Sequence, residues 1–264
     1  MCLLLIAHDA VPGYRLLVAA NRDEYHGRPT AAAGHWDDRP GLFAGRDLES
    51  GGTWLGVHAT GRFATVTNVR SGQAVRRGPR SRGLIVTDFL PAPHSAHEAA
   101  HALAADARDY DGFNLLAWDG ANLVWYSNQA GAPRLLERGV YTLSNAALDT
   151  QWPKTARLRR GFERVMARTG HDPVEALLAV LRDDTRAADD DLPDTGVGLE
   201  RERWLSSIFI DGGGAYGTRC SSVVTIDTRG HLLFHERRYD AEGAVSGDSR
   251  FELDLPAPAR EALR

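Results

Sequence analysis

The chain has 264 residues, of which 43% are hydrophobic and 25% are charged. This balance is typical of one large globular domain, here residues 1–264, with a full hydrophobic core. The formal net charge of −4 and a pI near 6.2 exclude a general electrostatic attraction to nucleic acid or to an anionic membrane. Lys154 is the only lysine, and this bias toward arginine indicates a GC-rich, bacterial genome.

The apolar segment at residues 3–7 does not have the features of a targeting signal. No basic region precedes it, it is shorter than a signal peptide's apolar region, and His8 and Asp9 follow it directly. No other stretch approaches the length needed to span a bilayer, so we expect a cytoplasmic protein without stable membrane insertion. Cys2 and Cys220 are too few for a disulfide framework, which leaves Cys2 as a free thiol.

Four hairpins are predicted, each from two apolar runs that flank a turn sequence. The paired runs are 3–7 with 14–20, 53–59 with 62–68, 113–118 with 122–127, and 221–227 with 231–238. Asp119-Gly120 is the strongest of the turn signals between them. Residues 250–255 are expected to add an edge strand.

Helices are expected in the middle of the chain. The predicted helical segments are 83–90, 95–107, 153–168 and 172–182. Ser95 and Glu98 have the spacing of a capping box, and Pro153 stands in a first helical turn. The acidic segment 183–198 is expected to be an exposed loop. Periodicity alone supports the α+β class, and the order of elements fits two antiparallel sheets covered by helices, a four-layer αββα sandwich.

The chemistry of the sequence begins at Cys2. Methionine aminopeptidases remove Met1 when residue 2 is small, so the mature chain is expected to begin with a free α-amine beside a thiol. A thiolate is a strong nucleophile, and an α-amine with a pKa of about 8 is a base suited to neutral pH. No histidine is then needed as a base. The alternative is that Cys2 is a small buried hydrophobic residue on a strand.

The residues after the second strand are Asn21, Arg22, Asp23 and Glu24, the tetrapeptide that names the NRDE family. The chain resembles this family, also called the transport and Golgi organisation protein 2 family, along nearly its whole length. Further motifs stand in the family's order, and these are Met1-Cys2, Arg28-Pro29, GGTWLG at 51–56, Thr67-Asn68, GFNL at 112–115, LSN at 143–145 and YGTR at 216–219. The resemblance implies the N-terminal-nucleophile (Ntn) hydrolase fold. It also implies that substrate contacts include Asn21, Arg22, Glu24 and Trp54.

The same positions resemble, more distantly, the cysteine Ntn hydrolases that cleave bile-salt amides, penicillin V and ceramide. That resemblance implies that Asp23 orients the amine and thiol of Cys2. It implies that Asn68 and Asn145 donate hydrogen bonds to the oxyanion, and that Arg219 supplies a fixed positive charge near the nucleophile. We therefore predict that these five residues converge on one cleft at the end of the two sheets. The alternative is that they are separate turn residues.

One departure from the distant hydrolases concerns Arg22. Those enzymes carry an arginine two or three residues before the motif aspartate, whereas Ala20 and Asn21 occupy these positions here. Because neighbouring residues on a strand point to opposite sides, Arg22 is expected to face away from Cys2. It would then anchor the loop through Glu24 or another carboxylate.

Two histidine groups could bind a ligand. His94, His97 and His101 have helical spacing and suit a soft or borderline metal, but no fourth ligand accompanies them. We therefore expect a solvated helix face and no metal site. His231 and His235 share a strand face and are expected to be ordinary surface residues.

An arginine-rich loop is the remaining candidate for binding anions. It contains Arg76, Arg77, Arg80 and Arg82. These side chains could dock phosphate or carboxylate groups of a ligand. On composition alone, a solvated loop is the stronger expectation.

Two functions follow from these observations. The first is an amidohydrolase without a cofactor, in which Cys2 cleaves the linear amide (C–N) bond of an N-acyl substrate. The second is a binding or trafficking module of the same fold for haem or acyl-CoA and lipids, since the family has been linked to both. In each case the partner is a small molecule. A purely structural protein has no sequence feature in its favour.

Overall fold

The computed structural model describes residues 3–70, 78–168, 172–211 and 214–255. These residues form two antiparallel sheets. The first sheet has the spatial order β10 (Gly139–Leu143), β1 (Leu3–Val11), β2 (Tyr14–Tyr25), β11 (Tyr216–Asp227), β12 (His231–Tyr239) and β13 (Val245–Asp254). The second has the order β3 (Thr30–Trp36), β4 (Arg39–Asp47), β5 (Leu55–His58), β6 (Phe63–Asn68), β7 (Phe113–Trp118), β8 (Leu123–Ser127) and β9 (Arg134–Leu136).

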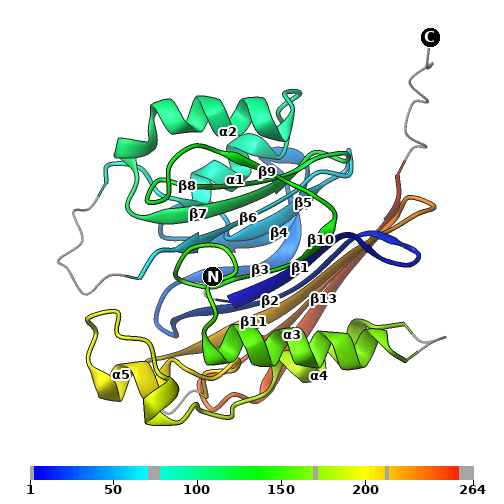
Figure 1. Cartoon of the computed structure of the whole chain (residues 1–264). Coiled ribbons are helices and arrows are strands. Elements are labelled where there is room, and N and C mark those ends of the chain that lie inside the picture. The colour runs from blue at the N-terminus through cyan, green and yellow to red at the C-terminus, as the bar shows by residue number, and fades with distance from the viewer. Residues whose placement is uncertain (1–2, 71–77, 169–171, 212–213, 256–264) are drawn as a thin grey trace.

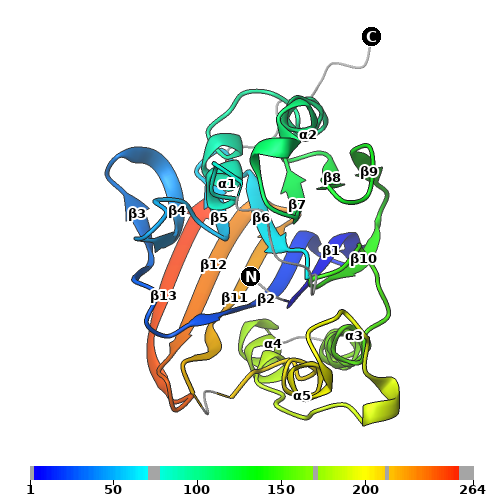
Figure 2. The same cartoon turned by 90° about the vertical axis from the view of Figure 1, so that its left-hand side faces the viewer.

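Helices cover the outer face of each sheet (Figure 1). On the second sheet lie α1 (Gly83–Phe89) and α2 (Ala96–Ala105), and on the first lie α3 (Pro153–Met166) and α4 (Val174–Leu181). Figure 2 shows the same layers from the side, with α5 (Leu199–Trp204) beside α3 and α4. The predicted four-layer αββα sandwich of the α+β class is therefore confirmed.

The apolar run at the start of the chain is explained by burial on both faces of β1. Leu4 and Ile6 belong to the core between the two sheets. Leu3 and Leu5 belong to a second core between the first sheet and helices α3 and α4. A strand that is covered on both sides needs apolar residues at every position, whereas a half-exposed strand alternates. Hydrophobic burial thus fixes β1, from Leu3 onward, between the two cores.

The four predicted hairpins and four predicted helices are present, with shifted ends. Ser95 caps α2 and forms the expected capping box with Glu98. Asp119 does more than form a turn, because its Oδ2 accepts a hydrogen bond of 2.7 Å from the Ala96 N–H and so helps to cap α2. No helix in the described ranges has both the length and the apolar character that crossing a bilayer requires.

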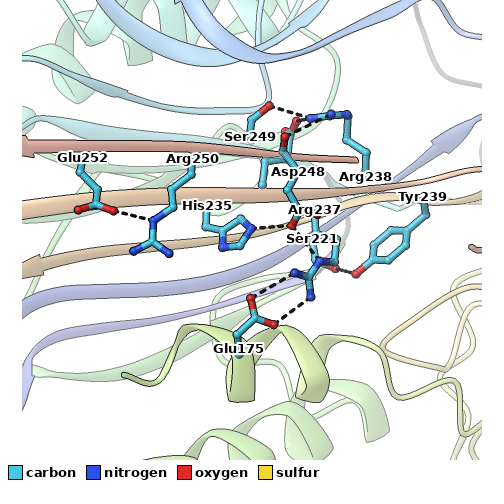
Figure 3. A network of polar contacts seen from close by, with 11 residues as sticks. Glu175, Ser221, His235, Arg237, Arg238, Tyr239, Asp248, Ser249, Arg250 and Glu252 are labelled. Atoms are coloured by element: carbon cyan, nitrogen blue, oxygen red, sulfur yellow. Dashed lines mark hydrogen bonds and ion pairs between the residues drawn. The ribbon is translucent and has the colours of Figure 1, made fainter. Parts of the chain in front are cut away.

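A polar network joins β12, β13 and α4 on the helix-covered side of the first sheet (Figure 3). His235 Nε2 lies 2.6 Å from Asp248 Oδ1, and Arg237 Nε donates to the same oxygen at 2.9 Å. The two terminal nitrogens of Arg237 donate to Glu175 of α4 at 3.1 and 3.2 Å. The expectation that His235 is a surface residue is wrong, because His235 is buried and paired with a carboxylate of the neighbouring strand.

The network predicts a pH-dependent contribution to stability. Burial raises the pKa of Asp248, but hydrogen bonds from His235 and Arg237 outweigh burial and hold this pKa below its ordinary value. The stabilisation is therefore present at neutral pH and is lost as the pH falls below about 4. Because the Asp248 side chain is 39% exposed, solvent screens these contacts in part. We expect Asp248→Ala to lower the free energy of unfolding by about 1 kcal/mol at pH 7, and by less at pH 3.

Asp254 offers a matched control on the same strand. Its Oδ1 lies 2.8 Å from Nδ1 of His231, but the Asp254 side chain is 90% exposed. Asp254→Ala should change the free energy of unfolding by less than about 0.5 kcal/mol. Urea titrations of both variants at pH 7 and pH 3 make the comparison, and equal losses of unfolding free energy at pH 7 would contradict a stabilising role for the His235–Asp248 pair.

Candidate active site

Arg22 lies between the two sheets near the end of β2. Its side chain is 3% exposed, and its guanidinium carbon is 4.2 Å from the centre of the Trp54 ring, which precedes β5 of the second sheet. Trp54 in turn packs over Gly45, where an added Cβ would lie 2.4 Å from the indole ring. This stacked pair connects the two sheets.

Arg22 does not form the expected ion pair with Glu24. Within the described ranges no carboxylate lies within ion-pair distance of Arg22, and its Nη1 is buried without a hydrogen-bond partner. The expectation that Arg22 anchors its loop through Glu24 is therefore wrong. The reason is that alternation along β2 turns Arg22 inward onto Trp54, whereas Glu24 Oε1 accepts a hydrogen bond from the Tyr25 N–H.

Asn21 faces the opposite side of β2 and is fully buried. Its two amide hydrogens are donated to the carbonyls of Leu181 and Ile208 at 2.8 and 2.9 Å. Its Oδ1 accepts a hydrogen bond of 2.7 Å from the Ser221 hydroxyl. These contacts give Asn21 a structural role, because they join the end of α4 to the first sheet and leave no amide hydrogen for a ligand.

Asp23 lies on the same side of β2 as Asn21 and is 3% exposed. Its Oδ1 accepts a hydrogen bond of 2.7 Å from the Thr218 hydroxyl of β11. The Thr218 hydroxyl also accepts a hydrogen bond from the Ile210 N–H at 2.9 Å. The Asp23 carboxylate is thus held in a fixed position at the end of the first sheet.

Arg219 stabilises the loop that follows β2. It stands at an irregularity of the β2–β11 pairing, between Thr218 and Cys220. Its Nη1 donates to the carbonyls of Tyr25 and Arg28 at 2.8 and 3.2 Å. Burial, followed by the nearby Arg22, lowers the pKa of Arg219. Arg22 and Arg219 border the same pocket.

Asn68 and Asn145 are brought together although they lie in different sheets. Asn68 ends β6 of the second sheet, and Asn145 follows β10 of the first sheet. Asn145 Nδ2 donates to the Asn68 carbonyl at 3.0 Å. The Arg70 N–H donates to the Asn145 carbonyl at 2.7 Å. Asn145 therefore connects the ends of the two sheets, and the side chain of Asn68 is left exposed.

Two pockets share Arg22 and Trp54 in their walls. The larger, which we call the Asn68 pocket, has a volume of about 130 Å³. Its polar lining includes Arg22, Glu24, Arg28, Asn68 and Arg82. The smaller, which we call the Cys220 pocket, has a volume of about 80 Å³. Its polar lining includes Arg22, Arg219, Cys220, Glu236 and Arg238.

The Cys220 pocket contains two titratable groups that the sequence did not single out. Burial, followed by the neighbouring Glu236 carboxylate, raises the pKa of the Cys220 thiol well above its ordinary value. Burial also raises the pKa of Glu236, which is 1% exposed. Glu236 was missed because its only signal is one charged residue among several polar ones in the predicted strand 231–238.

Cys2 lies outside the described residues. Its covalent neighbour Leu3 pairs with Asn21 in the β1–β2 register, and Arg22 is the next residue along β2. Of the other predicted site residues, Arg22, Glu24, Trp54 and Asn68 border one pocket. Arg219 and Arg22 both border the second pocket. Asn145 holds the Asn68 backbone through a hydrogen bond to its carbonyl. Asn21 and Asp23 face the helix-covered side of β2.

The histidines of α2 and the arginine-rich loop were the weaker candidates for ligand binding. His97 and His101 are exposed on α2 with their Nε2 atoms 3.2 Å apart. Among the described residues, no group of three histidine, cysteine, aspartate or glutamate side chains suits a metal ion. Arg80 pairs with Asp88 at 3.5 Å. Arg76 and Arg77 lie outside the described residues.

Comparisons with known proteins agree on one family. The family model described as "Transport and Golgi organisation 2" matches residues 1–241. The "Transport and Golgi organization protein 2 homolog" of Bos taurus is 33% identical over 256 residues, covering 90% of this chain and 92% of the relative. The homolog of Homo sapiens is 31% identical with the same coverage. These relatives are eukaryotic, so a bacterial origin stays a prediction.

A solved structure of a "Caenorhabditis elegans N-acylethanolamine-hydrolyzing acid amidase (NAAA) ortholog" is also similar. It has a TM-score of 0.49 and 12% sequence identity, and the match covers 84% of this chain and 92% of that chain. The family itself is shown by the family model and by the sequence relatives, which span almost the whole chain. The chain belongs to the transport and Golgi organisation 2 family.

Proposed function

We propose that this protein is an Ntn-type cysteine hydrolase that cleaves a linear amide bond, with Cys2 as the nucleophile. The observation that carries the proposal is the meeting of three segments at one end of the sandwich. Leu3, at the start of β1, pairs with Asn21, and Arg22 is the next residue along β2. Arg22 borders the same pocket as Asn68. Cys2 is bonded to Leu3, so its Cα is within about 3.8 Å of the Leu3 Cα whatever its conformation.

The reaction that we propose begins with removal of Met1. The α-amine of Cys2 takes the thiol proton, and the thiolate attacks the amide carbonyl. The amide C–N bond breaks as the ammonium returns its proton to the leaving amine, which yields a thioester. Water, deprotonated by the amine, then attacks the thioester and releases the acid and the free thiol. The thiol proton thus leaves with the amine product, and the proton taken from water passes through the α-amine to restore the thiol.

The described residues can assist these steps. In this proposal the exposed side-chain amide of Asn68 donates to the developing oxyanion, and Asn145 is a positioning residue that holds the Asn68 backbone. Asp23 lies on the opposite face of β2 from Arg22. In this proposal its fixed, buried carboxylate acts on the α-amine alone, and Asn68 acts on the oxyanion from the other face. Arg219 contributes positive charge near Arg22, which favours the thiolate.

The alternative function, a binding module, is favoured by the arginines of the Asn68 pocket. Glu24 and Asp47 also border it, and Arg28 is paired with Asp47 at 2.8 Å. Arg22 and Arg82 are therefore the arginines that suit an anionic group such as the phosphates of an acyl-CoA. Haem fits less well. Its iron needs an axial ligand, and the described lining of this pocket includes no histidine, cysteine, methionine or tyrosine.

Asn68→Ala tests the proposed reaction. We expect this variant to lower kcat/KM about 10²–10³-fold, because one oxyanion donor is lost. The measurement is hydrolysis of a panel of N-acyl amines and N-acyl amino acids, followed by mass spectrometry of both products. Asn122→Ala, an exposed residue of the β7–β8 turn, is the matched control and should keep the wild-type rate. Equal rates for the two variants would exclude Asn68 as an oxyanion donor.

A further inference from the structure

The Cys220 pocket contains a buried cation without a hydrogen-bond acceptor at one of its nitrogens. Arg22 is 3% exposed, and its Nη1 has no hydrogen-bond partner in the described structure. Arginine keeps its charge even when buried, so the desolvated guanidinium must be compensated by another group. The Trp54 ring compensates it only in part, because a cation–π contact satisfies no N–H donor.

The charges around the pocket are predominantly positive. Arg22, Arg219 and Arg238 border it, and Glu236 is the only carboxylate in its described wall. Glu236 Oε1 already accepts a hydrogen bond of 2.9 Å from the Ala33 N–H and lies 3.7 Å from Arg238 Nη1. Its Oε2 lies beside the weak Cys220 donor and accepts no hydrogen bond of normal geometry. One carboxylate therefore leaves an excess of positive charge.

The size and walls of the pocket restrict what can neutralise this charge. Its volume is about 80 Å³, and Trp54, Ala31 and Ala32 form apolar parts of its wall. Such a space suits a small planar anion with a short apolar stem. A guanidinium binds a planar carboxylate through two hydrogen bonds. A carboxylate carries one negative charge and is repelled less by Glu236 than a phosphate dianion is.

We propose that the Cys220 pocket binds the carboxylate group of a small-molecule ligand, with Arg22 as the principal hydrogen-bond donor. The ligand's short apolar stem lies against Trp54 and covers Cys220. This binding does not depend on the chemistry at Cys2. Because Arg22 and Trp54 also border the Asn68 pocket, the proposal identifies carboxylate-bearing compounds as the ligand class to test in both pockets.

Arg62 shows that an unpartnered arginine alone would not support this conclusion. It is also buried, lies 4.1 Å from the Phe89 ring, and has two nitrogens without hydrogen-bond partners. However, Arg62 belongs to the wall of neither pocket. Arg22 differs because a cavity of suitable size and positive charge lies against it. Arg62 is therefore the matched control for Arg22.

The test uses the whole protein and the reactivity of Cys220. The rate of Cys220 alkylation by a small neutral reagent is measured by peptide mass mapping at constant ionic strength, with increasing propionate, propionamide or inorganic phosphate. We expect propionate to slow the alkylation in a saturable manner, and the uncharged propionamide and phosphate to have no such effect. Arg22→Met should weaken the propionate effect by on the order of tenfold or more, and Arg62→Met should leave it unchanged.

Several outcomes would overturn the proposal. Equal protection by propionamide would show that shape and not charge is recognised, and equal or stronger protection by phosphate would show a general anion site. Absence of saturable protection by propionate would exclude the carboxylate site. Persistence of protection in Arg22→Met would exclude Arg22 as the donor. If Arg22→Met does not fold, the three probes on the wild-type protein still decide whether a carboxylate is bound.

Discussion

Cys2→Ala is expected to lower amide hydrolysis about 10³-fold or more while leaving the fold intact. The thiol forms the covalent intermediate in the proposed reaction, so its removal leaves only the residual effect of the binding groups. The free energy of unfolding should change by less than about 1 kcal/mol, because the substitution removes a single sulfur atom. Product formation and urea denaturation, measured on the same sample, separate the two effects.

A second variant distinguishes an N-terminal nucleophile from an ordinary catalytic cysteine. Insertion of a glutamate between Met1 and Cys2 prevents removal of Met1 and keeps the thiol, but it places a peptide bond where the α-amine would be. We expect this variant to be as inactive as Cys2→Ala, since its thiol has lost the base. Full activity of the insertion variant would contradict the role of the α-amine.

Gly52→Ala is expected to destabilise the protein by about 3 kcal/mol, the largest stability effect that we predict. An added Cβ at Gly52 would lie 2.4 Å from the carbonyl carbon of Gly83, at the beginning of α1. The three nearest atoms all belong to the Gly83 backbone, so the clash cannot be relieved by rotation of a side chain. Since Gly52 precedes Thr53 and Trp54, the displacement should also disturb the wall that both pockets share.

Gly27 provides the control for this prediction. An added Cβ at Gly27 has no heavy atom within 4 Å, so Gly27→Ala should change the free energy of unfolding by less than about 0.5 kcal/mol. Urea midpoints of the two variants give the comparison. A similar midpoint for Gly52→Ala and wild type would show that α1 can move away from the β4–β5 connection at little cost.

Local signals in the sequence were sufficient for much of the fold. The Asp119-Gly120 turn and the Ser95 capping box act over a few residues, and both are present in the structure. Strands β3 and β4 were not predicted. Residues 30–34 are small or polar and have no apolar alternation, and their pairing with β4 is irregular. Such a hairpin is stabilised by contacts with distant segments, which include the hydrogen bond that the Ala33 N–H donates to Glu236 Oε1.

The end of β2 shows a second limit of sequence analysis. The polar residues from Asn21 onward predicted the end of the strand at residue 20, but β2 continues to Tyr25. The strand persists because the polar side chains are satisfied by distant groups. Asn21 donates a hydrogen bond to the Leu181 carbonyl of α4 and accepts one from the Ser221 hydroxyl. Asp23 accepts a hydrogen bond from the Thr218 hydroxyl. These partners are far away in sequence, so no local pattern could reveal them.

The candidate site could be predicted in its residues but not in its arrangement. Asn68 and Asn145 were identified by resemblance, yet their contact depends on the packing of two sheets. The Cys220 pocket was not foreseen at all. Its key groups, Arg22, Cys220 and Glu236, come together only through the β2–β11–β12 register, in which Cys220 pairs with both Arg22 and Arg238.

The central claim is that residue 2 is an N-terminal nucleophile, and one measurement tests it directly. Intact mass and peptide mapping are performed on the wild-type protein after brief incubation with an N-acyl substrate followed by acid quench. We predict a chain that lacks Met1 and carries one acyl group on the Cys2 sulfur, which disappears as product accumulates. Retained Met1 on protein that turns over substrate, or an acyl group on another residue, would contradict the account.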